Sequence, residues 1–255
     1  MALPQDPGML EERNWIHFLP VLTTAVAVVF TVILFRHWQR RPQARYLMWW
    51  TIGVGFYGVG TLTEAATTLF GWNEPIFRAW YISGALLGGV LLAQGTVYLM
   101  LKKRAADRLT VAMLTYAAVA AVFVLSTPIL HDAVEAHRLS GRVMEWQWVR
   151  LFSPLLNTYA LVFLVGGAAW SAWRYWRRSD RPRSRVVGNA LIAVGALLPG
   201  IGGSFTRAGH VEVLYVTELV GLLMIWAGYR GMTRVVGPTI HSAQQAAYAI
   251  ERNQT

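Results

Sequence analysis

The chain has 255 residues, of which 55% are hydrophobic and only 14% are charged, and its mean hydropathy is +0.39. So few charges cannot cover a water-soluble globule of this size, which excludes an ordinary soluble domain and favours a membrane protein. The net charge of +10 does not indicate a nucleic-acid partner, because the basic residues flank apolar runs, where they orient a chain in the lipid bilayer and attract anionic lipid.

The chain begins with a polar, acidic segment, residues 1–17, which lacks the basic start of a signal peptide. Apolar runs then follow, each about as long as a helix needs to cross a hydrocarbon core of ~30 Å. We expect helices at 18–35, 46–70, 77–101, 109–130, 151–173, 186–205 and 211–229. The expected fold class is all-α, a seven-helix transmembrane bundle within 18–235.

Two segments outside these helices have patterns of their own. Residues 131–150 form the only long connection, and their mixture of charge with Trp146 and Trp148 predicts an amphipathic segment, either a lid over the bundle or a plain connector. In the tail, residues 236–255, apolar residues recur at three- and four-residue steps from Ile240 to Ile250. This spacing is typical of a signalling helix that starts a coiled coil.

The connections predict the orientation, because Lys and Arg in short loops are retained in the cytoplasm. Most of the 23 Lys and Arg residues lie in the connections that share a side with the C-terminus. The opposite side keeps only Arg13, Arg78, Arg138, Arg142, Arg150 and Arg207. We therefore expect the N-terminus outside and the C-terminus inside, in a bacterial-type cytoplasmic membrane.

Small residues recur within the apolar runs, especially glycines in 46–70, 77–101 and 186–205. Close backbone approach supplies much of the packing energy between helices in lipid, so these glycines predict a compact bundle. Pro199 lies inside 186–205, where it removes one backbone hydrogen bond. We expect a kink or hinge there.

Intramembrane polar residues fall into an outer layer at one depth. Glu64, Asn157 and Glu218 each lie roughly 7–10 Å below the outer interface, by ~1.5 Å rise per residue. Ionisable residues in lipid almost always face a partner or a wet cavity. The outer layer therefore predicts a ligand-binding pocket whose rim holds Arg78, Tyr81, Arg207, His210 and Tyr215.

Three interpretations of this outer layer stay open. It binds a small ligand, a lipid or an ion from outside; or its acids pair with arginine and fix helix register; or it transfers protons. If Arg78 or Arg207 lies between Glu64 and Glu218, both acids stay ionised, whereas two acids that converge alone repel each other.

A second, inner layer holds Gln94 and Tyr98 four residues apart on one helix face, with Asn189 at a matching depth. Neutral amides and phenols commonly hydrogen-bond between helices in membranes. We expect a structural role for this inner layer.

Motifs for catalysis and cofactors are missing from the sequence. It has no cysteine and no HExxH, P-loop or dinucleotide fingerprint. None of the six histidines is placed for a three-histidine metal site or for mid-span haem ligation. The only lysines, Lys102 and Lys103, lie in a loop, so a retinal Schiff base has no candidate. No metal is expected, an enzyme is not favoured, and the sequence names no cofactor.

Two stretches carry a family resemblance: RSRVVGNALIAVGALLPGIGG from residue 183, and YVTELVGLLMIWAGYRGMTRVVGP from residue 215. With their basic entry, LLP step and aromatic inner end, they resemble the N-terminal seven-helix sensor modules of bacterial histidine kinases. Residues 39–101 are similar in style. The resemblance implies a sensor followed by a signalling helix, although no kinase sequence follows here. An effector beyond residue 255 and a subunit of a larger membrane assembly are both compatible with this.

The leading hypothesis is a sensor or receptor-like module that couples an outer pocket to its cytoplasmic tail. A solute or proton-coupled transporter is the first alternative, because RRPQAR at 40–45 and DRPRSR at 180–185 resemble repeated helix entries, which pair Gly60 with Gly200. A structural subunit of a larger complex is the second. Partners expected are the lipid bilayer, a small-molecule or lipid ligand, and a second copy or another membrane subunit.

Overall fold

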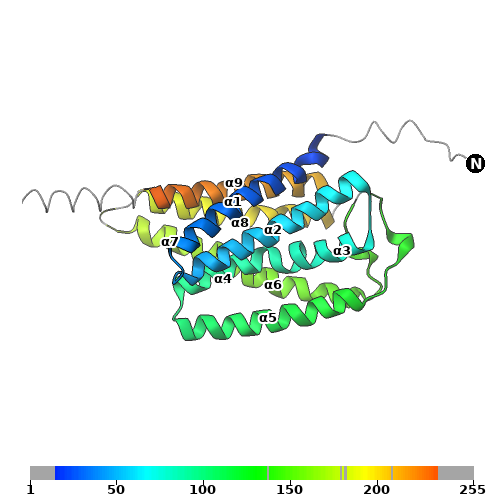
Figure 1. Cartoon of the computed structure of the whole chain (residues 1–255), viewed down its shortest axis with the longest axis horizontal. Coiled ribbons are helices and arrows are strands. Elements are labelled where there is room, and N and C mark those ends of the chain that lie inside the picture. Colours follow the sequence, from blue (N-terminus) through cyan, green and yellow to red (C-terminus); the bar gives the residue numbers. More distant parts are fainter. Residues whose placement is uncertain (1–14, 137, 179, 181–182, 208, 235–255) are drawn as a thin grey trace, which may run out of the picture.

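The computed structural model describes residues 15–136, 138–178, 180, 183–207 and 209–234, which form a bundle of antiparallel helices (Figure 1). The expected N-terminal segment 1–17 is described only from Trp15 onward. The expected signalling helix within 236–255 lies outside the described residues.

The described residues form seven helical rods in succession. Two of the rods are composite, because a π-helical segment, Tyr81–Leu87, joins α3 to α4, and another, Leu161–Gly166, joins α6 to α7. The helices are α1 (Leu19–Arg40), α2 (Arg45–Phe70), α3 (Glu74–Trp80), α4 (Gly88–Met100), α5 (Lys103–Ser126), α6 (Phe152–Ala160), α7 (Gly167–Trp176), α8 (Arg183–Arg207) and α9 (Val211–Arg234). Short 3-10 turns precede α1 and occur within the connection from α5 to α6.

Six of the rods are long and apolar enough to cross a membrane. They indicate a multi-pass membrane protein and confirm the all-α expectation. The remaining rod, α2, has 26 residues, enough at ~1.5 Å per residue to span ~30 Å. It is less apolar because Gly, Thr and Glu64 interrupt it, and it packs against both α1 and α4. The expected count of seven therefore depends on α2.

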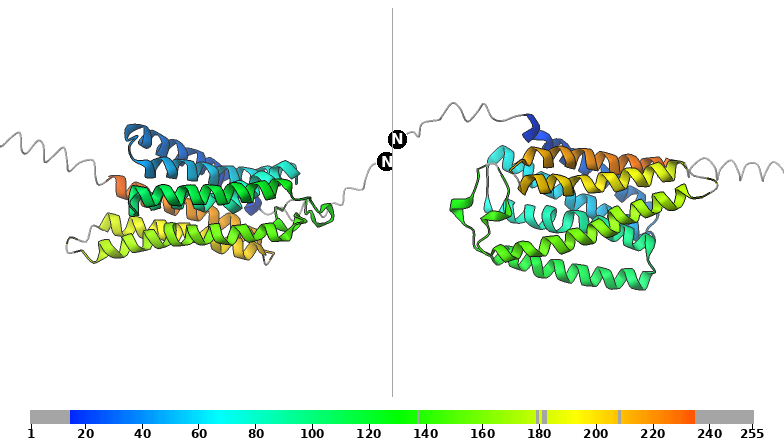
Figure 2. Two further views of the ribbon diagram at one scale, coloured as in Figure 1. Left: turned by 90° about the horizontal axis from the view of Figure 1, so that it is seen from below. Right: turned by 180° about the vertical axis from the view of Figure 1, so that it is seen from behind.

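Successive rods alternate in direction, so α1 begins at one end of the bundle and α9 finishes at the other (Figure 1). Figure 2 shows from two further sides that the long helices share one axis. We call the end that carries residues 127–151 the loop end. The opposite end, where the α1–α2, α4–α5 and α7–α8 connections lie, is the basic end.

The closest pair of helices is α8 and α9, which pack along a seam of glycines. A Cβ atom added to Gly195 would lie 2.6 Å from the carbonyl oxygen of Gly221, and one on Gly228 would lie 2.4 Å from that of Gly188. Contacts this close leave no room for any side chain. They also bring Cα–H groups against carbonyl oxygens, which recurs at helix–helix interfaces.

Pro199 lies inside α8, which continues as one helix from Arg183 to Arg207. Its ring removes the N–H that would bond the carbonyl of Gly195. That carbonyl points instead at α9, where a Cβ on Gly221 would lie 2.5 Å away from it. The expected hinge residue is thus packed at the centre of the glycine seam.

The connection between α5 and α6 lies across the loop end. Its residues Val143, Met144 and Val149 are buried, while Trp148 is 47% exposed, as the amphipathic expectation required. The backbone N–H of Trp72 donates to the carbonyl of Ala136 (2.7 Å), which ties the connection to the end of α2. Arg138 donates to the carbonyl of Thr206 (2.7 Å) and ties it to the end of α8. This packing favours a lid over a plain connector.

Candidate functional site

Two acids from distant parts of the sequence meet inside the loop-end half of the bundle. Glu64 on α2 is only 4% exposed, and its carboxyl group lies close enough to that of Glu218 on α9 for the two to interact directly. A carboxylate is only an acceptor, so two carboxyl groups can hydrogen-bond each other only when one of them carries a proton. Two acids this close, on different helices, are suited to share one proton.

Aromatic donors surround this acid pair. The indole Nε1 of Trp80, the last residue of α3, donates to Oε1 of Glu64 (2.9 Å). The hydroxyl of Tyr57 donates to the backbone carbonyl of Glu218 (3.0 Å). Buried Tyr215 shares a hydrogen bond with Thr68 and lies close enough to both acids to interact electrostatically. Of these contacts, only the Trp80 indole reaches a carboxyl group, whereas Tyr57 ties α2 to the backbone of α9 beside the acids.

Each acid keeps one oxygen free. Oε2 of Glu64 and Oε2 of Glu218 are buried and have no hydrogen-bond partner among the described residues. Within the same residues, no Lys, Arg or His forms an ion pair with either acid. A buried oxygen without a donor is costly. The acid pair therefore has two buried oxygens that no described N–H or hydroxyl group satisfies, where a shared proton or a small cation would be stabilised.

Arg78, expected at the rim, lies elsewhere. Its guanidinium bonds Glu74 (Nη2–Oε1 2.6 Å) and the carbonyls of Thr127 (2.9 Å) and Val124 at the end of α5. All of these partners belong to α3 and α5. The alternative in which Arg78 separates the two acids is therefore wrong, and this arginine ties two helices together.

The other expected pocket residues divide into those that reach the acid pair and those that do not. Tyr215 reaches it, as described above. Tyr81 is buried one residue beyond Trp80, but its hydroxyl bonds Ser153 (3.1 Å) on α6. Asn157 is exposed, so its placement in the buried layer beside the acids is wrong. His210 is also exposed, so its expected place at the rim stays a prediction. The backbone of Arg207 ends α8, and its side chain lies outside the described part of the structure.

Asn157 is exposed because α6 packs its other face inward. Ser153 and Leu156 are the buried residues of α6. Successive helix residues are ~100° apart, so the position after Leu156 turns away from the core. Depth alone had placed Asn157 with the acids, and depth carries no information about the face.

The inner layer exists, but with different members. Gln94 is fully buried and accepts from Tyr159 (2.5 Å) while its amide nitrogen donates to Thr110 (2.6 Å). Tyr98 donates to Asp107 (2.6 Å), which also pairs with Arg45 (2.9 Å) at the basic end. Every one of these groups has a partner, which agrees with the structural role expected for Gln94 and Tyr98.

Asn189 does not belong to this inner network. Its amide donates to the carbonyl of Arg185 (2.7 Å) on its own helix and to the sulfur of Met232 (3.4 Å) on α9. The expectation that Asn189 joins Gln94 and Tyr98 is therefore wrong, because shared depth on a different helix does not bring side chains together.

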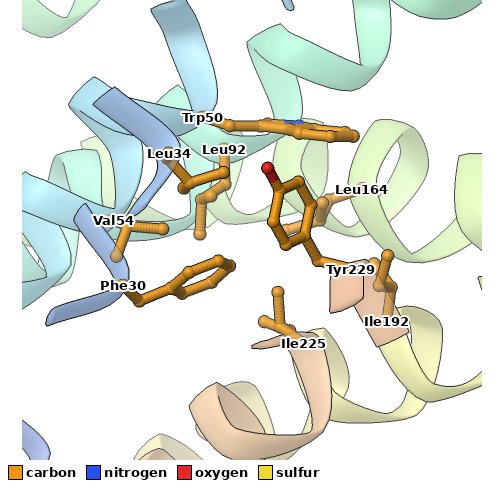
Figure 3. A pocket seen from close by; sticks show the side chains of 9 residues that line it. All are labelled: Phe30, Leu34, Trp50, Val54, Leu92, Leu164, Ile192, Ile225 and Tyr229. Atoms are coloured by element: carbon orange, nitrogen blue, oxygen red, sulfur yellow. The ribbon is translucent and has the colours of Figure 1, made fainter. Parts of the chain in front are cut away.

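An apolar cavity lies between the acid pair and the basic end (Figure 3). Trp50 lies across one side of it and Phe30 and Ile225 across the other, with the Tyr229 hydroxyl pointing between them. That hydroxyl is bonded to Nδ1 of His37. The complete lining is Phe30, Leu34, Trp50, Val54, Leu92, Leu164, Ile192, Ile225 and Tyr229. Apart from the hydroxyl, the lining offers nothing that could conduct a proton or bind an ion.

Sequence reasoning missed Trp80 and Thr68 as neighbours of the acids. Tyr57 was predictable, since it lies seven residues before Glu64 and so on the same helix face. Trp80 had no such signal, because an interfacial tryptophan is equally typical of a membrane-boundary belt.

Comparison of this chain with models of known protein families, with curated proteins and with solved structures finds no match. The fold and the acid pair together define a class, a multi-pass helical membrane protein in which two carboxyl groups from distant helices meet within the bundle.

Proposed function

We propose that this chain is a receptor-like membrane module that responds to protons, or to a small cation, shared between Glu64 and Glu218. The observation that carries this proposal is the close pair of acids, each with an unpartnered buried oxygen. A structural pair would be expected to have a basic partner or a complete set of donors. A larger ligand is less suited to a site whose two carboxyl groups already touch.

Access from the loop end has a candidate route. Nε2 of His17 lies 3.6 Å from Oε1 of Glu212, which is 40% exposed. The His17 ring also packs edge-on against the Tyr215 ring, with centroids 6.2 Å apart. Tyr215 in turn lies beside both acids. These groups would mark the approach of a proton or cation from the outside, if the N-terminus faces outward as proposed.

The response would pass along α9 to the basic end. A Cβ on Gly221, one turn beyond Glu218, would lie 3.2 Å from the Pro199 ring. A change of charge at Glu218 would therefore act on the point where α8 lacks one backbone bond. Residues 235–255 follow α9 and would carry the signal, as the resemblance to sensor modules implies.

The experiment uses the absence of cysteine from the chain. Thr233→Cys, on an exposed position near the end of α9, would carry an environment-sensitive fluorophore in proteoliposomes. We expect an external pH step to change its fluorescence, and Glu64→Gln or Glu218→Gln to abolish the change. Glu145→Gln, which alters an exposed acid at the same end, is the matched control. Equal responses in all four proteins would refute the proposal, and sodium or potassium steps at fixed pH separate a cation from a proton.

The alternative function, transport of a solute or of protons, makes different demands on the structure. A transporter needs a polar route through the bundle, whereas the apolar cavity of Figure 3 lies between the acids and the basic end. The sequence repeat that suggested transport pairs Gly60 with Gly200, but these two glycines have different surroundings. Gly60 packs against Gly84, whereas a Cβ atom on Gly200 would meet nothing within 4 Å. Proton uptake into the same liposomes that depends on Glu64 would favour the transporter instead.

A further inference from the structure

At the basic end, α7 finishes and α8 begins in a cluster of arginines that have few acids near them. Arg178 pairs with Asp180 (3.2 Å). Arg174, Arg177, Arg183 and Arg185 form no ion pair with any described residue. Their side chains are exposed. We call these four residues, with Trp170, Trp173 and Tyr175, the α7–α8 corner. The corner thus presents uncompensated positive charge at one place on the bundle.

Aromatic rings hold two of these guanidinium groups in place. Arg177 lies over the Trp173 ring, 4.5 Å from its centroid, and Arg185 lies over Tyr175 at 5.3 Å while donating to its hydroxyl (3.2 Å). Cation–π contacts of this kind leave the N–H groups at the edge of the guanidinium available to an anion. The corner therefore has ordered donors with no acidic partner.

The surface next to these donors is apolar. Trp170 and Trp173 are 53% and 42% exposed, and their ring centroids are 4.9 Å apart. Val162, further along the same rod, is 55% exposed. Tryptophan rings prefer the headgroup layer of a bilayer, and exposed apolar surface beyond them contacts acyl chains. A lipid whose anionic headgroup binds these donors would therefore place its acyl chains against this apolar surface.

Within the described residues, a second basic connection, between α4 and α5 at the same end, lacks aromatic rings that would hold its cations in place. This α4–α5 connection, taken together with the first residues of α5, carries Lys102, Lys103 and Arg104, beside exposed Leu99, Met100 and Leu101. No described aromatic ring lies under any of these three cations. The α4–α5 connection therefore supplies similar charge without ordered donors and serves as a matched comparison.

We propose that the α7–α8 corner binds the headgroup of one anionic phospholipid. Arg174, Arg177 and Arg185 hold its phosphate, and its acyl chains lie against Trp170 and Trp173. This proposal is independent of the function of the acid pair.

The test measures lipid retained by the full chain in native mass spectrometry, after extraction from bilayers that contain phosphatidylglycerol and phosphatidylcholine. We expect selective retention of phosphatidylglycerol. Arg174→Gln with Arg177→Gln should weaken its binding by roughly tenfold or more, because two charged contacts to one headgroup are lost. The control, Lys103→Gln with Arg104→Gln, removes the same charge and should stay within about twofold of wild type.

Three results would overturn the proposal. Equal weakening of lipid binding in both double variants would indicate that only diffuse surface charge attracts the lipid. Retention of phosphatidylcholine equal to that of phosphatidylglycerol would show that the site does not select an anionic headgroup. Displacement of the lipid by excess inorganic phosphate would indicate a site for free phosphate.

If the glutamine variant does not fold, the double variant Arg174→Lys with Arg177→Lys keeps the charge and loses the planar donors. It should weaken retention by at least a few-fold, and unchanged retention would also contradict the proposal.

Discussion

At the residue scale, the central feature is a pair of adjacent acids, of which Glu64 is buried and accepts a hydrogen bond from Trp80. Isolated ionised carboxylates inside a bundle are very costly, whereas one charge spread over two hydrogen-bonded groups is less so.

Infrared spectroscopy can test whether the acids share a proton, because a protonated carboxyl group and a carboxylate absorb at different frequencies. We expect one band of a protonated carboxyl group in the wild type and its loss in Glu218→Gln; a spectrum unchanged by that substitution would place the proton elsewhere.

Trp80, at the end of α3, should contribute to the stability of the fold through its hydrogen bond to Glu64. Trp80→Phe keeps the ring but removes the donor to Glu64, so a buried oxygen loses its partner. We expect the free energy of unfolding to fall by about 1–3 kcal/mol, measured by denaturation in mixed micelles. Trp15→Phe, at a position that is 69% exposed, should change it by less than about 0.5 kcal/mol. Equal effects of the two substitutions would mean that the indole donor contributes nothing.

Arg78 is predicted to stabilise the loop end rather than bind a ligand. Arg78→Met leaves the carbonyls of Val124 and Thr127 without this donor, which should lower the free energy of unfolding by about 1–3 kcal/mol. Arg78→Lys should recover only part of this, because an ammonium cannot bridge several acceptors in a fixed plane. The same micelle titration tests both, and Arg104→Met on the exposed α4–α5 connection is the control.

At the scale of elements, the α8–α9 pair depends on the absence of side chains from its seam. Gly195→Ala puts a methyl group 2.6 Å from the Gly221 carbonyl oxygen, so the helices must separate. We expect a loss of about 1–3 kcal/mol in the free energy of unfolding. Gly200→Ala is the matched control on the same helix, because a Cβ there meets nothing within 4 Å. It should be neutral or stabilising by up to about 1 kcal/mol, and a similar loss at both positions would show that the seam is not the cause.

The helices were largely predictable from the sequence, and the differences between their expected and observed ends have physical reasons. The apolar run ends at residue 35, yet α1 continues to Arg40, because long basic side chains reach the interface while their backbone stays helical. The start of α5 at Lys103, six residues before the expected 109, has the same cause. The π-helical segments were not predictable, since they leave no mark on hydrophobic composition.

At the scale of the whole molecule, the sequence was sufficient for membrane class and for the convergence of the two acids, since lipid forces such groups inward. It was insufficient for the rest of the site. Asn157 and Asn189 were assigned by depth, and a helix of known depth can still be rotated about its axis. The face of each helix is set by packing among all the rods, which no single run of residues encodes.

The proposed orientation can be measured directly, because the chain has no cysteine of its own. Asp132→Cys lies in the exposed loop-end connection and Lys103→Cys in an exposed position at the basic end. A maleimide that cannot cross membranes should label Asp132→Cys in intact cells and Lys103→Cys only after lysis. The reverse pattern would invert the orientation, and labelling of both from outside would remove α2 or another rod from the membrane.

The segment Tyr81–Leu87 lies between Trp80, which serves the acid pair, and Gln94, which serves the inner network. A π turn accommodates one more residue than the α-turn it replaces, so it absorbs an extra residue while the two flanking halves keep their faces. In a regular α-helix the same extra residue would rotate one half of the rod by ~100° relative to the other, and either Trp80 or Gln94 would face the wrong neighbours. The π turn thus keeps both polar groups directed at their partners.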